Sequence, residues 1–112
     1  MDIIFKTSKL QKICNDQKQL VRTYGPQMAM LMRRRLDELF AASCLEEMRY
    51  LKQTRCHELR GNRAGQLSVD LDHPYRLIFQ SADESVPRKP DGGLDWTKIT
   101  AIMILSVEDT HE

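Results

Sequence analysis

The sequence predicts an α+β fold, in which an N-terminal strand and a helical hairpin pack on one face of a small, mainly antiparallel sheet. Three observations lead to this class. Apolar residues recur every three or four positions between residues 10 and 40, which is typical of amphipathic helices. Apolar and polar residues alternate between residues 67 and 79, which is typical of strands. Residues 98–107 are apolar on both faces, which suits a central strand.

The first half of the chain predicts a strand followed by two helices. Residues 3–5 form a short apolar run of strand-forming residues, and the Thr or Ser that follows can cap a helix. We expect this helix to continue to the dipeptide Gly25-Pro26, which ends one helix and begins the next. The second helix is expected over residues 27–43, and the two helices should pair as a hairpin. Its predicted buried stripe comprises Met28, Leu31, Met32, Leu36, Leu39 and Phe40.

The second half predicts a short helix and then strands. Residues 45–51 are charged and helical in pattern, and residues 67–71 and 75–79 form an antiparallel hairpin around the turn Asp72-His73-Pro74. Residues 81–97 contain Ser, Asp, Glu, Pro and Gly with little apolar content, so we expect an exposed excursion before the last strand.

Composition limits the class of protein. With 112 residues, 41% of them hydrophobic and 29% charged, we expect a single globular domain spanning residues 1–112. No apolar run approaches the roughly 18 residues that cross a bilayer, and the N-terminus lacks the pattern of a signal peptide, so we expect a cytoplasmic protein without a membrane partner. The 3 cysteines show no C-x-x-C spacing and the 3 histidines are far apart, so we expect reduced thiols, no metal site and no cofactor.

Charge is distributed unevenly along the chain. Residues 1–63 carry 13 basic and 7 acidic side chains, whereas residues 64–112 carry 4 and 9. The total of +1 therefore hides a basic half, which is typical of proteins that neutralise phosphates. The alternative interpretation is a solvated helix surface, and residues 33–35, three consecutive arginines, fit it, because they spread around a helix.

Several side chains suited to phosphodiester chemistry flank the predicted strands. His57, Arg60 and Arg63 enter the turn before the strand at 67–71, and Asp109 and His111 follow the last strand. An imidazole with an ordinary pKa near 6.5 exchanges protons at neutral pH, and a guanidinium stabilises charge on phosphate oxygens. If the last strand is central, its end brings Asp109 and His111 near the turn.

The chain contains three segments in order: HELRGNRAGQLSV from His57, YRLIF from Tyr75 and ILSVEDTH from Ile104. These segments resemble motifs of the HigB-type toxins of the RelE/ParE superfamily. The family shows the pattern H-x-L-K/R-G-D/N-R-x-G-x-W/Y-S-I/V, then W-R-I/L-x-F, then a terminal E-D-Y-H, and the first two motifs match in spacing without a gap. The resemblance covers roughly the last half of the chain, apart from residues 81–97.

This resemblance implies a RelE/ParE-like fold and the toxin of a type II toxin-antitoxin system. The expected activity is a ribosome-dependent, metal-independent mRNA endonuclease that inhibits translation. The expected partners are the ribosome with its mRNA and a HigA-like helix-turn-helix antitoxin encoded beside the toxin, through which alone the toxin would meet operator DNA.

The resemblance also implies roles for individual residues. Its catalytic set is His57, Asp109, His111 and Arg76, and its RNA-binding set is Arg60, Arg63, Arg76 and Thr110. In the family's reaction the ribose 2′-hydroxyl attacks the adjacent phosphate and yields a 2′,3′-cyclic product. Asp109 or one histidine would remove the proton, the other histidine would protonate the leaving group, and Arg76 with Arg60 would stabilise phosphate charge. The acid and base assignments are interchangeable.

Two departures from the family pattern keep alternatives open. Thr110 stands where the family commonly has tyrosine, and Leu67 replaces the aromatic residue of the first motif. Both changes remove candidates for stacking a base, so weaker or altered cleavage is expected. The alternatives are a catalytically weakened toxin that acts as an antitoxin-binding co-repressor, and a non-enzymatic ParE-like gyrase poison. Retention of His57 and His111 argues against the gyrase poison.

Overall fold

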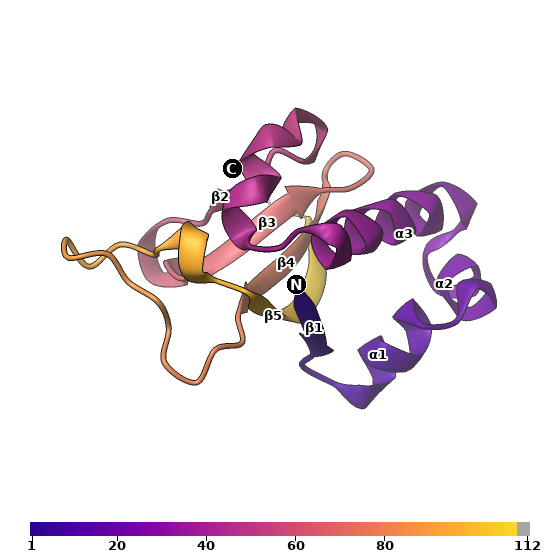
Figure 1. The fold of residues 1–112 in the computed structure, drawn as a ribbon. Coiled ribbons are helices and arrows are strands. Elements are labelled where there is room, and N and C mark those ends of the chain that lie inside the picture. The colour runs from indigo at the N-terminus through magenta and orange to yellow at the C-terminus, as the bar shows by residue number, and fades with distance from the viewer. Residues whose placement is uncertain (110–112) are drawn as a thin grey trace.

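The computed structural model describes residues 1–109, which form an α+β domain of principal extents 44 × 27 × 26 Å (Figure 1). In chain order the elements are β1 (Asp2–Phe5), α1 (Ser8–Cys14), α2 (Gln17–Tyr24), α3 (Pro26–Ala41), the 3₁₀ helices η1 (Leu45–Tyr50) and η2 (Lys52–Thr54), β2 (His57–Glu58), the 3₁₀ helix η3 (Gly61–Arg63), β3 (Gln66–Asp70), β4 (Tyr75–Ser81), the 3₁₀ helix η4 (Trp96–Lys98) and β5 (Ala101–Asp109). The predicted fold class is confirmed.

The strands form one mixed sheet in the order β1-β5-β4-β3-β2. β1 pairs with β5 in parallel, and the other three pairs are antiparallel. The last strand is therefore internal, as its apolar pattern predicted. Between Ile78 and Phe79 the register of β4 against β5 shifts by one residue, which is a β-bulge in β5. β2 was not predicted from the sequence, since a two-residue edge strand is too short to show alternation.

Alternating residues divide the sheet into two faces. One face packs under the helices, and in Figure 1 α3 and the 3₁₀ helices η1 and η2 lie in front of the strands. The sheet residues in this core are Leu67, Val69, Leu71, Leu77, Phe79, Ile102 and Ile104, and the helices contribute Leu10, Ile13, Leu20, Met32, Leu36, Leu39, Leu45 and Met48. The other face carries the intervening residues of the same strands, and most of these are polar.

The helical region differs from its prediction in one respect. The single helix expected before Gly25 is broken into α1 and α2 at Asn15 and Asp16. The carboxylate of Asp16 accepts hydrogen bonds from the backbone N–H groups of Lys18 and Gln19, so it caps a new helix instead of continuing the old one. The break after Tyr24 is as predicted, because Gly25 adopts a φ of 85° and Pro26 starts α3.

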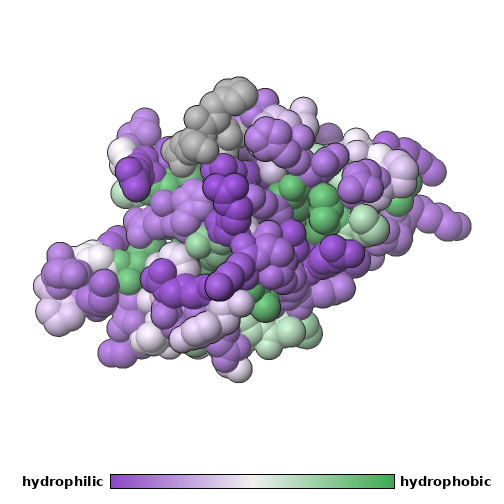
Figure 2. All heavy atoms as spheres, turned by 90° about the horizontal axis from the view of Figure 1, so that it is seen from above, coloured by the Kyte–Doolittle hydropathy of each residue, from purple (hydrophilic) through white to green (hydrophobic). Residues whose placement is uncertain are grey.

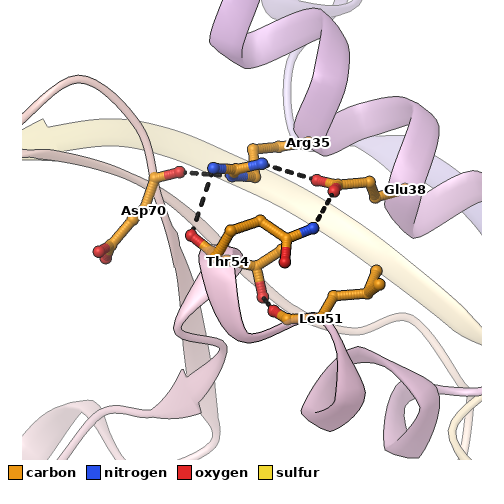
Figure 3. Close-up of polar contacts among 6 residues, drawn as sticks. Arg35, Glu38, Leu51, Thr54 and Asp70 are labelled. Carbon is orange, nitrogen blue, oxygen red and sulfur yellow. Dashed lines mark hydrogen bonds and ion pairs between the residues drawn. The ribbon is translucent and has the colours of Figure 1, made fainter.

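The buried stripe of α3 also differs from its prediction. Phe40 is 70% exposed, whereas Arg35, which the pattern placed on the surface, is only 5% exposed. Arg35 donates from Nε to the Asp70 carbonyl (2.7 Å), and from its terminal nitrogens to Glu38 Oε1 (2.8 Å) and the Gln53 carbonyl (3.3 Å; Figure 3). Glu38 also accepts a bond from the Gln53 side chain. A buried guanidinium satisfied in this way ties α3 to η2 and to the end of β3.

The excursion at residues 81–97 is only partly as expected. It extends from the side of the molecule opposite α1 and α2 (Figure 1), and most of its residues are exposed. Leu94 and Trp96, however, are buried in the main core, so the expectation of an exposed excursion is wrong for its last part. Their burial holds the last part of the excursion against η1.

Hydrophilic residues cover most of the surface seen in Figure 2, with separate small apolar patches between them. None of the helices within residues 1–109 is both long and apolar enough to cross a bilayer.

Candidate functional site

The face of the sheet opposite the helices gathers the candidate residues of three separate motifs. Strand pairing aligns His57 on β2 with Ser68 on β3, Ser68 with Ile78 on β4, and Ile78 with Ser106 on β5. A second row aligns Asp70, Arg76 and Glu108. Because paired residues share a face, His57 and Arg76 lie on the same surface, two strands apart, which is roughly 10 Å across the sheet. We call this surface the open face.

Arg76 is held firmly within the open face. Its side chain is only 11% exposed, and its Nε lies 3.4 Å from Asp70 Oδ1. Asp70 Oδ2 in turn lies 3.7 Å from Nε of Arg55. The backbone carbonyl of Asp70 is the group that accepts from Arg35 on the helical side. Asp70 therefore couples Arg76 on the open face to the buried network beneath it.

Arg63 is fixed by a second carboxylate. Its two terminal nitrogens donate to the two oxygens of Glu108 at 2.8 and 2.9 Å, while Nε and one terminal nitrogen donate to the side-chain oxygen of Gln66. Gln66 is on β3 and Glu108 on β5, so the guanidinium of Arg63 bridges two strands that flank β4. The hydrogen bonds that Arg63 donates to Glu108, together with one from the Ser106 hydroxyl, hold the pKa of Glu108 below its ordinary value.

His57 has a defined tautomer. Its Nδ1 lies 2.9 Å from the backbone carbonyl oxygen of Arg55. A carbonyl oxygen only accepts hydrogen bonds, so Nδ1 carries the proton, and the lone pair of the neutral ring is on Nε2. Arg55 itself adopts a φ of 47°, in the left-handed region that non-glycine residues rarely occupy, and this turn directs its carbonyl toward the ring. An imidazole oriented in this way can accept a proton at Nε2.

The turn between β2 and β3 depends on its glycines. Gly61 and Gly65 have φ values of 65° and 94°, and the N–H of Gly65 donates to the carboxylate of Glu58 at 2.9 Å. This turn projects Arg63 over the sheet. Arg60, at its start, is exposed, and its guanidinium makes no hydrogen bond or ion pair with the rest of residues 1–109.

The C-terminal candidates are placed less completely. Asp109 is exposed at the end of β5 and is paired in register with Tyr75, so strand alternation puts Glu108, and not Asp109, in the row of Arg76. Thr110 and His111 lie outside the described residues. The structure therefore brings His57, Arg63 and Arg76 to one face and places Arg60 at its margin.

Two partner residues were missed by sequence reasoning. Asp70 and Glu108 hold Arg76 and Arg63, yet neither was singled out as a site residue. Their signal was present in the strand alternation, because Ser68 and Asp70 interrupt the core residues of β3, and Ser106 and Glu108 do the same in β5. Residues 1–109 contain no cluster of three His, Cys, Asp or Glu side chains placed to hold a metal ion.

The structure alters the interpretation of Leu67, one of the two departures from the family pattern. Leu67 is fully buried in the core under the helices, paired in register with Phe79. A side chain at this position points away from the open face and is not available to stack a base there. The prediction that Leu67 removes a stacking residue is therefore wrong, and Thr110 is the departure that remains.

The fold and the open face fit a RelE-like toxin, the class that the sequence motifs indicated. A profile of HigB-like toxins, described as the RelE-like toxin of type II toxin-antitoxin system HigB, matches residues 3–89. The chain belongs to this family and is a toxin of a type II system, which implies an antitoxin partner. Comparison with curated proteins gives no match. The profile match ends within the excursion, before Trp96 and β5.

Proposed function

We propose that this toxin is a ribosome-dependent endonuclease that cleaves mRNA without a metal ion. The observation that carries the proposal is the open face, where an imidazole with its lone pair on Nε2 shares one surface with the ordered guanidinium of Arg76. Such a face supplies proton transfer and anion stabilisation together, which are the two requirements of phosphodiester cleavage by the RNA's own hydroxyl.

The proposed reaction is an internal transfer at phosphorus. The ribose 2′-oxygen bonds to the adjacent phosphorus while the bond from phosphorus to the 5′-oxygen of the next nucleotide breaks. One group takes the proton of the 2′-hydroxyl and another delivers a proton to the departing 5′-oxygen, so that the products are a 2′,3′-cyclic phosphate and a 5′-hydroxyl. His57 Nε2 fills one of these roles, and Asp109 or His111 fills the other.

The arginines divide into two kinds. Arg76 and Arg60 would stabilise the charge that develops on the phosphate oxygens. Arg63 has its guanidinium bonded to Glu108 and Gln66, so we assign it the shaping of the face and the approach of the strand instead of direct charge neutralisation. Thr110 would lie against the RNA without the stacking surface of a tyrosine.

The partners follow from the same proposal. The antitoxin would be a HigA-like helix-turn-helix protein, and operator DNA would be reached only through it. The substrate would be mRNA on the ribosome, which places the site of action in the cytoplasm.

A weakened toxin acting as co-repressor is the second candidate, because Thr110 replaces the family's tyrosine. It predicts that Thr110→Tyr increases cleavage. A gyrase poison is the third outcome, and it would arrest growth without any cutting of mRNA.

The test is cleavage of mRNA by purified toxin on translating ribosomes. The toxin is treated with a chelator before it is mixed with ribosomes in their normal magnesium, and His57→Ala, His111→Ala and Arg76→Ala are compared with Arg34→Ala, an exposed position on α3. We expect ribosome-dependent cutting that falls at least about tenfold in the first three variants only. Growth arrest without cutting would contradict the proposal.

A further inference from the structure

A pocket of about 300 Å³ lies beside His57, at the outer edge of β2. Its lining comes from η1, β2 and the excursion: Arg49, Cys56, His57, Glu58, Lys89, Gly93, Leu94 and Trp96. This volume is at the lower end of the range of roughly 300–1,000 Å³ for small-molecule sites. It shares His57 with the open face and is otherwise built from residues that the reaction does not use.

The wall formed by the excursion is ordered by its own backbone. Residues 87–95 make a narrow hairpin, in which the N–H of Lys89 donates to the Gly93 carbonyl (2.8 Å) and the N–H of Asp95 donates to the Pro87 carbonyl (3.0 Å). The side chains fit closely around Gly93, since a Cβ on it would approach Asp91 Oδ1 to 3.1 Å and Lys89 Cε to 3.3 Å. The hairpin thereby sets Lys89 against the pocket.

The floor of the pocket is a stacked pair. The guanidinium carbon of Arg49 lies 3.8 Å from the centroid of the Trp96 ring, and Trp96 is buried beneath it. Nε of Arg49 donates to Glu46 at 2.8 Å, which holds the guanidinium plane in place. The Arg49 side chain remains 51% exposed. A flat, delocalised cation that is supported from below is a surface on which a nucleobase can stack.

The charge of the pocket favours a base over a phosphate. Each of its two cations has a carboxylate partner, since Arg49 pairs with Glu46 and Lys89 Nζ lies 3.8 Å from Asp91 Oδ2. Glu58 adds a further carboxylate, and one of its oxygens already accepts from Gly65. Counted with their partners, the two cations of the pocket face three carboxylates, so a neutral planar ring with polar edges fits it better than a phosphate does.

We propose that this pocket holds one unstacked nucleobase of the RNA, next to the nucleotide that is cut. The base lies flat on the guanidinium of Arg49, and its edge meets the ammonium of Lys89 as donor and the carboxylate of Glu58 as acceptor. The inference rests on the proposed cleavage of RNA, and it makes the excursion a determinant of which nucleotide flanks the cut. Gly93, Leu94 and Trp96 of the lining lie beyond residues 3–89, the part of the chain that the family profile matches.

Trp96 is the single tryptophan of the chain, so its fluorescence reports directly on the floor of the pocket. The probe is a short single-stranded RNA with 2′-O-methyl riboses, which lacks the attacking hydroxyl and is not cut. The matched probe is the same strand without bases. We expect saturable quenching by the first strand and none by the second.

Two variants separate stacking from charge. Arg49→Lys keeps the positive charge but removes the planar guanidinium on which the base would stack. We expect it to lower the RNA affinity measured by base-dependent quenching about tenfold, within the range that follows loss of a base stack. Arg34→Lys, which makes the same exchange on exposed α3, should leave the quenching unchanged. Thermal unfolding of both variants checks that each is folded. Equal quenching by the baseless strand, no quenching by either strand, or unchanged affinity in Arg49→Lys would overturn the proposal.

Cleavage on ribosomes keeps this inference distinct from the proposed function. Arg49→Lys should change the nucleotide preference beside the cut, while His57→Ala lowers cutting at least about tenfold. If the toxin cuts mRNA but shows no base-dependent quenching, the proposed nuclease stands and the proposed base-binding pocket is refuted. If the toxin shows the quenching and never cuts mRNA, the pocket stands as an RNA-binding site and the proposed nuclease is refuted.

Discussion

Arg63 and Glu108 are 45 residues apart in the sequence and are joined by two parallel N–H···O bonds of 2.8 and 2.9 Å across the open face of the sheet. The pair connects the turn after β2 to the last strand, so it joins two of the three motifs that carry the family resemblance. Bidentate pairing of this kind fixes geometry as well as charge.

The first prediction concerns the pH dependence of this pair. The pKa of Glu108 is lower in the folded protein than its ordinary value of 4.5, so the pair stabilises the fold above that pH and its contribution is lost as the pH falls through the folded pKa. Because both side chains are about one-third exposed, we expect Glu108→Gln to cost only about 1 kcal/mol at neutral pH. Urea unfolding should show this cost disappearing as the pH falls through the lowered pKa of Glu108; a cost that persists unchanged in strong acid would rule the pair out as its source.

The second prediction concerns Arg35. Its replacement by Met removes one partner of a buried ion pair, takes the Arg35 donor from two backbone carbonyls, and leaves Glu38 with the Gln53 amide but without its cation. We expect a loss of about 3 kcal/mol in the free energy of unfolding. Arg34→Met, on the exposed side of the same helix, should change it by less than about 0.5 kcal/mol. Equal effects of the two substitutions in urea titrations would show that the buried network contributes nothing.

The third prediction separates the roles of Asp70. Asp70→Asn keeps the backbone carbonyl that Arg35 uses but removes the charge that holds Arg76. We expect cleavage to fall about tenfold, because Arg76 loses its fixed position, and the melting temperature to change much less than in Arg35→Met. Single-turnover cleavage beside thermal unfolding checks this, and a variant that melts early while cutting normally would contradict it.

The fourth prediction concerns Leu67. Restoring the family's aromatic residue with Leu67→Tyr should destabilise the protein by about 1–3 kcal/mol, because the position is fully buried against the helices and a larger ring overpacks it. It should not raise cleavage. Cleavage by Leu67→Tyr is compared with cleavage by Thr110→Tyr, which restores the family's tyrosine in the C-terminal motif. A more active and equally stable Leu67→Tyr protein would show that this face of β3 reaches the RNA.

Periodicity predicted those parts of the fold that depend on long regular patterns. The strands around Val69 and Leu77 and the internal position of the last strand follow from alternation and from apolar residues on both faces. The break at Asp16 was missed because apolar spacing continues across it, and only the capping carboxylate distinguishes two short helices from one.

The candidate site was predictable in its residue types and less so in its partners. The motifs identified His57, Arg63 and Arg76, which the sheet does bring to one face. Their anchors Asp70 and Glu108 depend on strand register, which a sequence does not display. The burial of Arg35 and Trp96 was hidden for a similar reason, because tertiary contacts between distant segments determine it.

The most direct test of the central claim is the chemistry of the RNA ends produced by the wild-type toxin. Translating ribosomes carrying a defined mRNA are incubated with toxin, and the new 3′ and 5′ ends are mapped and typed, beside the same mRNA free in solution. We expect cuts only on the ribosome, each leaving a 2′,3′-cyclic phosphate and a 5′-hydroxyl, and we expect His57→Ala to lose them. Cuts with 3′-hydroxyl and 5′-phosphate ends, or full cutting by His57→Ala, would contradict it.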